Sequence, residues 1–131
     1  MAFFLHSIDG SGKVPGIEYL PCSAITPKAG MALTQTAGNL AIATGATAPA
    51  YISLCERSAA CAAGELIPVL RVGRDMVFQT NFSASASSIK LGDKVTLHSD
   101  GMQVTTNTTS GVAEVVYMDG TASGSMCRVR F

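Results

Sequence analysis

A repeated pattern constrains the fold of this chain more than any other feature of its sequence. Residues 92–106 read GDKVTLHSDGMQVTT, and subtracting 62 from each position gives residues 30–44, which read GMALTQTAGNLAIAT without a gap. Each copy leads to a glycine that opens a run resembling a strand, GELIPVLRV from Gly64 and GSMCRVRF from Gly124, at an offset of 60. The two matches predict a duplicated unit of strand, turn, strand, loop and closing strand.

The turns inside the two copies use related residues. The first copy has Ala37-Gly38-Asn39 and the second has Asp100-Gly101. Gly, Asn and Asp tolerate the positive φ that tight hairpin turns require. The flanking apolar residues have the spacing of strands rather than of a helical face. We therefore predict an all-β fold, a compact barrel-like or tulip-like domain with little or no helix.

The chain of 131 residues is long enough for one domain with a sizeable core. Residues 1–28, rich in Gly and Pro, are predicted to form an N-terminal arm, followed by a single β-domain over 29–131 with repeats at 29–80 and 91–131. Apolar side chains are costly to leave in water, so those of the arm either pack on the domain's own core or contact a neighbouring subunit. These candidate contact residues are Phe3, Phe4, Leu5 and Ile8. The chain ends in a strand pattern, so we expect removal of its last four residues to unfold the domain.

Charge and hydropathy exclude several classes of partner. Nine basic and nine acidic side chains balance to zero without a charged run, so we expect no binding to nucleic acid or to an anionic membrane. No apolar stretch approaches the roughly 20 residues that cross a bilayer. The N-terminus also lacks the basic start and apolar centre of a signal peptide, so we expect synthesis in a cytoplasm.

The four cysteines do not indicate a metal site. Cys22, Cys55, Cys61 and Cys127 contain no CxxC pair and lack the regular spacing of a zinc site. Synthesis in a cytoplasm favours reduced thiols, with Cys127 as a small buried hydrophobic residue. A disulfide between Cys55 and Cys61 across a loop is the alternative.

No catalytic group is evident either. Nucleophilic catalysis needs a base beside a Ser or Cys, and His6 and His98 are the only histidines. His98 directly precedes the turn at Asp100-Gly101, where an exposed histidine is ordinary. The glycines form no nucleotide-binding motif. We therefore expect a protein without enzymatic activity, cofactor or metal.

Several stretches resemble small phage and prophage head-decoration, or capsid cement, proteins. They cover residues 29–131 and read AGMALTQTAGNLAIATG, PAYISL, AAGELIPVLRV, LGDKVTLHSDGMQVT and GVAEVVYMDGTASGSMCRVRF. The resemblance implies a β-domain on the outer surface of the virion head, often a homotrimer, which clamps subunits of the major capsid protein after synthesis in the bacterial cytoplasm. It also implies that the arm contacts the capsid. Three weak contacts in a trimer gain avidity, so no single site needs a strong motif.

Two other functions remain open from the sequence. A carbohydrate-binding or host-surface-binding module of a phage particle would use exposed aromatic rings, for which Tyr19, Tyr51 and Tyr117 are the candidate tyrosines. A small hydrolase would lose its activity on His98→Ala without a change in melting temperature.

Overall fold

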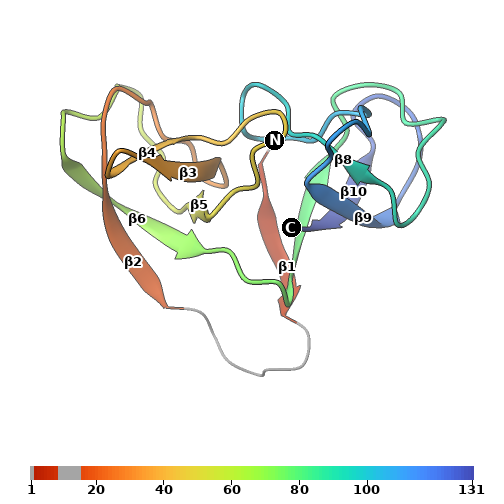
Figure 1. The fold of residues 1–131 in the computed structure, drawn as a ribbon, viewed down its shortest axis with the longest axis horizontal. Coiled ribbons are helices and arrows are strands. Elements are labelled where there is room, and N and C mark those ends of the chain that lie inside the picture. Colours follow the sequence, from red (N-terminus) through yellow and green to blue (C-terminus); the bar gives the residue numbers. More distant parts are fainter. Residues whose placement is uncertain (1, 9–15) are drawn as a thin grey trace.

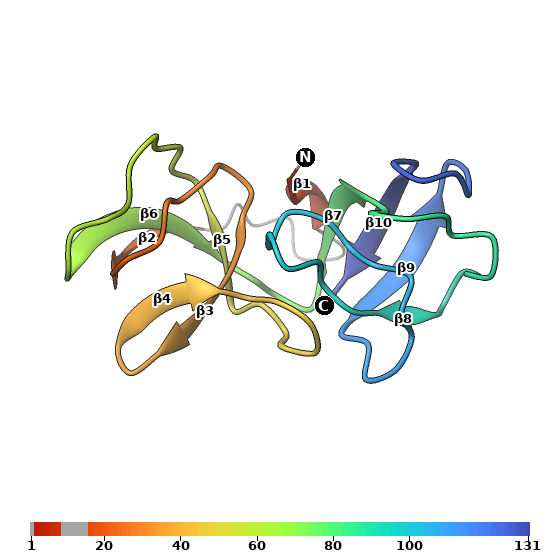
Figure 2. The same cartoon turned by 90° about the horizontal axis from the view of Figure 1, so that it is seen from above.

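The computed structural model describes residues 2–8 and 16–131, and these are all-β without a helix. The predicted fold class is confirmed. Figures 1 and 2 show two lobes side by side, with β1 and β7 near their junction. The strands are β1 (Phe4–Ile8), β2 (Ile17–Cys22), β3 (Ala32–Thr36), β4 (Asn39–Ile42), β5 (Tyr51–Ser53), β6 (Glu65–Arg71), β7 (Met76–Asn81), β8 (Lys94–Val95), β9 (Ala113–Met118) and β10 (Met126–Arg130).

Each lobe is built on its own sheet. The first is a closed barrel in the order β2-β4-β3-β5-β6, and the second is a five-stranded sheet in the order β1-β7-β10-β9-β8. A parallel pairing of Cys22 with Leu40 joins β2 to β4 and closes the barrel. The β3–β4 hairpin turns at Ala37 and Gly38, whose φ angles of 50° and 83° are those that tight turns require.

The pairing registers show that the two lobes repeat one motif. Leu33 on β3 pairs with Tyr51 on β5, and adding 62 to both gives Val95 and Ala113, which pair between β8 and β9. The hydrogen bonds agree, since the amide of Gly30 donates to Ser53 and, 62 residues later, the amide of Gly92 donates to Val115. The same strands are therefore paired in the same register in both halves.

The repeat also includes a strand that precedes the region recognised in the sequence. Glu18 on β2 pairs with Val69 on β6, and adding 60 gives Phe78 and Val129, which pair between β7 and β10. We therefore define unit 1 as residues 17–71 and unit 2 as residues 77–131, each boundary displaced by 60.

These boundaries differ from the predicted 29–80 and 91–131. Strand β2, which was assigned to the arm, opens unit 1, and β7 opens unit 2 instead of ending unit 1. The Gly and Pro content of residues 1–28 did not prevent strand formation, because Pro21 lies near the end of β2 opposite Leu66. Met1 and residues 9–15 of the predicted arm lie outside the described residues.

The gap-free match of residues 30–44 with 92–106 holds only for the outgoing strand. Gln35 pairs with Leu40 in unit 1, whereas Leu97 pairs with Val104 in unit 2. The first partners differ by 62 and the second by 64, so the turn of unit 2 is two residues longer. The Asp100 carboxylate stabilises this longer turn by accepting a hydrogen bond from the amide of Met102 at 2.8 Å.

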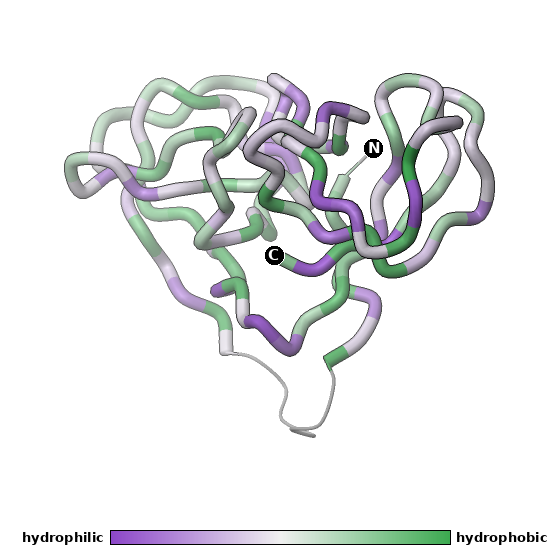
Figure 3. The backbone as a smooth tube through the Cα atoms, turned by 45° about the vertical axis from the view of Figure 1, so that its right-hand side comes forward, coloured by the Kyte–Doolittle hydropathy of each residue, from purple (hydrophilic) through white to green (hydrophobic). Residues whose placement is uncertain are grey.

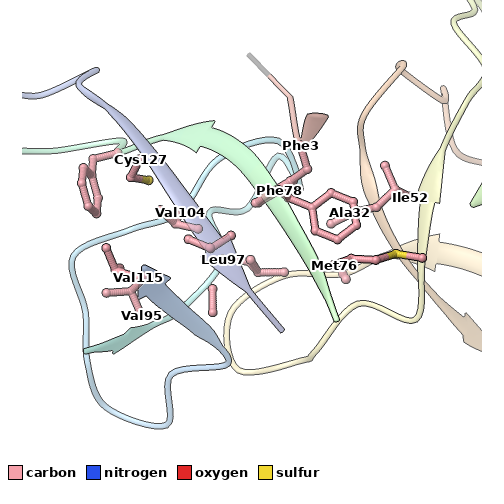
Figure 4. Close-up of a cluster of buried hydrophobic side chains, with 14 of the residues drawn as sticks. Phe3, Ala32, Ile52, Met76, Phe78, Val95, Leu97, Val104, Val115 and Cys127 are labelled. Atoms are coloured by element: carbon pink, nitrogen blue, oxygen red, sulfur yellow. The ribbon is translucent and has the colours of Figure 1, made fainter. Parts of the chain in front are cut away.

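The larger hydrophobic core crosses the junction between the lobes. Phe3 and Phe78 lie there beside Ala32, Ile52 and Met76 (Figure 4), and all five are buried. Along both lobes, apolar segments alternate with polar ones (Figure 3), as expected for strands with one buried face. A second core fills the barrel.

A disulfide between Cys22 and Cys61 links β2 to the loop before β6, with 6.3 Å between the Cα atoms. The expectation of reduced thiols and the alternative Cys55–Cys61 pairing were both wrong. The loop after β5 folds back, and the amide of Cys61 donates to the carbonyl of Ile25 at 2.8 Å, so Cys61 lies next to the end of β2. Cys55 is a free, half-buried thiol. Cys127 is buried as predicted, and burial raises the pKa of its thiol to about 12.

Candidate interaction surface

Strand β1 connects the two lobes. On the side of unit 1, the amide of Phe3 donates to the carbonyl of Gly30 at 2.8 Å. On the side of unit 2, β1 pairs antiparallel with β7, where Leu5 lies opposite Phe78. The ring of Phe3 packs edge-on against Phe131, with 5.5 Å between the centroids. This strand therefore belongs to the core and also forms an edge of the second sheet.

The four predicted contact residues divide between two environments. Phe3 is 1% exposed and lies in the core, and Ile8 is half-buried against the same core. Phe4 is 59% exposed and Leu5 is 38% exposed. Only Phe4 and Leu5 are therefore available to a partner while β1 stays on β7.

Phe4 and Leu5 border an apolar hollow of about 230 Å³ at the junction of the lobes. Its opposite wall comes from unit 1, where Leu54 directly follows β5 and is 44% exposed. We call the exposed side chains of Phe4, Leu5 and Leu54 the β1 rim. Sequence analysis missed Leu54, because no local pattern indicates that a loop residue after β5 faces the N-terminal strand. The lining residues are Phe3, Phe4, Leu5, Ala29, Gly30, Ile52, Ser53, Leu54, Leu70 and Phe78.

A second hollow of about 330 Å³ lies at the start of β2 and the end of β6. Ile17, Val72 and Met76 form apolar parts of its wall. Glu18 and Arg71 form the polar part, joined by two hydrogen bonds of 2.8 Å. The hydrogen bond from Arg71 lowers the pKa of Glu18, and the one to Glu18 raises the pKa of Arg71.

The histidine of the turn in unit 2 belongs to a structural network. His98 Nδ1 lies 3.2 Å from Asp100 Oδ1, and the other oxygen of that carboxylate accepts a hydrogen bond from Gln103 at 3.0 Å. Gln103 in turn accepts a hydrogen bond from Asn81 on β7 at 2.9 Å. No hydroxyl or thiol within residues 2–8 and 16–131 hydrogen-bonds to His98, so these groups hold the turn against β7 and do not form a catalytic dyad with a nucleophile.

The three tyrosines do not form one platform for a sugar. Tyr51 is buried, with the Arg71 guanidinium 5.1 Å above its ring. Tyr117 lies in the other unit and has Arg128 4.5 Å from its ring. Tyr19 is 63% exposed. A sugar would therefore find one open tyrosine ring, which favours a protein partner.

Among the described residues, no cluster of three His, Cys, Asp or Glu side chains could hold a metal ion. The described part of the chain also has no helix of the length and hydropathy that a membrane crossing requires. No protein-family model and no characterised protein matches this chain. The β1 rim is therefore the candidate functional site with the most support from the geometry.

Proposed function

We propose that this protein is a structural, non-enzymatic decoration protein that stabilises the outer surface of a phage head. The supporting observation is the β1 rim, an exposed apolar surface around a hollow, presented on a strand whose other face is in the core. Exposed apolar groups that border a concavity are typical of protein interaction sites. The major capsid protein is the proposed partner.

Three properties of the chain support a role in an assembly. Its net charge is zero, which gives little repulsion between molecules packed closely on a shell. The rim is small, which suits a homotrimer that gains affinity from three simultaneous contacts. The sequence also resembles head-decoration proteins in the order and composition of its β-segments.

The test uses expanded heads of the encoding phage that lack the decoration protein. Co-sedimentation measures binding of the wild type and of the double variant Phe4→Ser/Leu54→Ser, and a thermal ramp measures the temperature at which the heads break. Burial of one large apolar side chain contributes about 1.5–3 kcal/mol, so loss of two should weaken binding by roughly two orders of magnitude or more.

Leu91→Ser is the matched control. Leu91 is 64% exposed in unit 2 and does not border the β1 rim hollow. We expect this variant to bind heads and to raise their disruption temperature as the wild type does. Equal binding by the double variant would refute the role of the β1 rim, and a wild-type protein that ignores heads would refute the proposed function.

A further inference from the structure

The two units differ in the neighbour of their first strand. In unit 2, β7 pairs with β10 on one side and, from Met76 to Gln79, with β1 on the other. In unit 1, β2 pairs with β6 on one side. Among the described residues, the other side of β2 meets only Leu40, at Cys22. Residues 16–19, which correspond to 76–79 after subtraction of 60, therefore have an unpaired edge.

The hollow of about 330 Å³ lies at this unpaired edge. Adding 60 to Glu18 and Arg71, which line it, gives Phe78 and Phe131. Those two rings lie 5.6 Å apart, and Phe131 packs against Phe3. The hollow of unit 1 thus corresponds to the place that β1 and its buried ring occupy in unit 2.

We propose that residues 16–19 accept an extended segment of another protein as an added antiparallel strand, with one apolar or aromatic side chain in this hollow. Main-chain hydrogen bonds to a sheet edge supply affinity in such complexes, and side-chain pockets supply specificity. Ile17 and Met76 provide apolar walls for the inserted side chain. The Arg71 guanidinium provides a cation that can lie over an aromatic ring. This inference goes beyond head decoration and does not depend on it.

A second copy of the chain is a poorer occupant than a different protein. Its β1 would first have to leave β7, which would break the Phe3–Gly30 hydrogen bond and expose Phe78 and Phe131. The hollow of unit 1 has the Glu18–Arg71 ion pair in place of those two rings. The exchange would lose aromatic packing, whereas a foreign segment with no such seat of its own has nothing to give up.

The test uses a synthetic peptide as a free strand. Its sequence is that of residues 2–8, AFFLHSI, acetylated and extended by lysines for solubility, because this segment already pairs at the corresponding place in unit 2. Amide hydrogen exchange is followed by NMR on the full chain during titration. We expect saturable binding and about tenfold or greater slowing of exchange at unpaired amides within residues 16–20, with exchange at 76–79 unchanged.

The control peptide carries proline at the positions of Leu5 and Ser7, which removes two backbone donors. Protection at residues 16–20 that this peptide fails to produce supports the proposal. Absence of binding at millimolar peptide overturns it, as does protection that is equal for both peptides or is confined to residues 76–79. Because no heads are present in the assay, its failure is distinguishable from failure of the proposed function.

Discussion

Replacement of Phe3 by alanine should destabilise the whole protein, although Phe3 lies near the N-terminus. Its side chain is 1% exposed and packs 5.5 Å from the ring of Phe131 in the core that crosses both lobes. Removal of a buried phenylalanine ring typically costs about 3–5 kcal/mol, from lost apolar burial and from the cavity that remains. We expect Phe3→Ala to lower the free energy of unfolding by about that amount.

The neighbouring residue supplies the comparison. Phe4 is on the same strand but is 59% exposed, so Phe4→Ala should change the free energy of unfolding by about 0.5 kcal/mol or less. Urea denaturation followed by circular dichroism measures both variants and the wild type. A change below about 1 kcal/mol for Phe3→Ala, or equal changes for the two variants, would refute the assignment of β1 to the core.

Three further predictions concern the same framework. Gly30→Ala should lower the melting temperature in a thermal scan by destabilising the protein by about 1–3 kcal/mol, because φ is +80° there and the added Cβ would lie 2.5 Å from that of Ala2; an unchanged melt would contradict this. The double variant Cys22→Ser/Cys61→Ser should lose about 4 kcal/mol, given the separation of 39 residues, whereas Cys55→Ser should stay within about 0.5 kcal/mol. Denaturant titration measures both losses, and intact-mass analysis after alkylation without reductant should show two free thiols in the wild type, where four would exclude the disulfide. Deletion of residues 128–131 should unfold the domain, because it removes fully buried Val129 and the ring of Phe131; a soluble truncation with an unchanged cooperative melt would contradict this.

The fold class and the duplication were accessible from the sequence because they depend on local chemistry. Gly30 and Gly92 match at an offset of 62, and both have positive φ, at 80° and 92°. A turn that needs such an angle retains glycine, so it leaves a readable mark. The alternating apolar residues around these turns mark strands in the same way.

The first strand of each unit left no comparable mark. Strands β2 and β7 occupy the same place in the two units but read IEYLPC and MVFQTN. Backbone pairing needs no particular side chain, so two strands can share a register without sharing letters. The Cys22–Cys61 disulfide was missed for a related reason, because the reversal of the chain after β5 is a tertiary feature.

The candidate site was only partly predictable. Hydropathy identified the apolar residues of β1, and alternation along a strand places Phe3 and Phe4 on opposite faces. Which face meets the core depends on the second lobe, since Phe3 packs on Phe131 at the other end of the chain. Leu54 joins the β1 rim only because the two units lie against each other.

Amide hydrogen exchange of the protein bound to expanded heads, compared with the free protein, would locate the bound surface. If the β1 rim contacts the capsid, exchange should slow at β1 and at Leu54, while the loop around Leu91 keeps its free rate. Protection around Leu91 with β1 and Leu54 unchanged would contradict the assignment of the β1 rim as the capsid-binding surface.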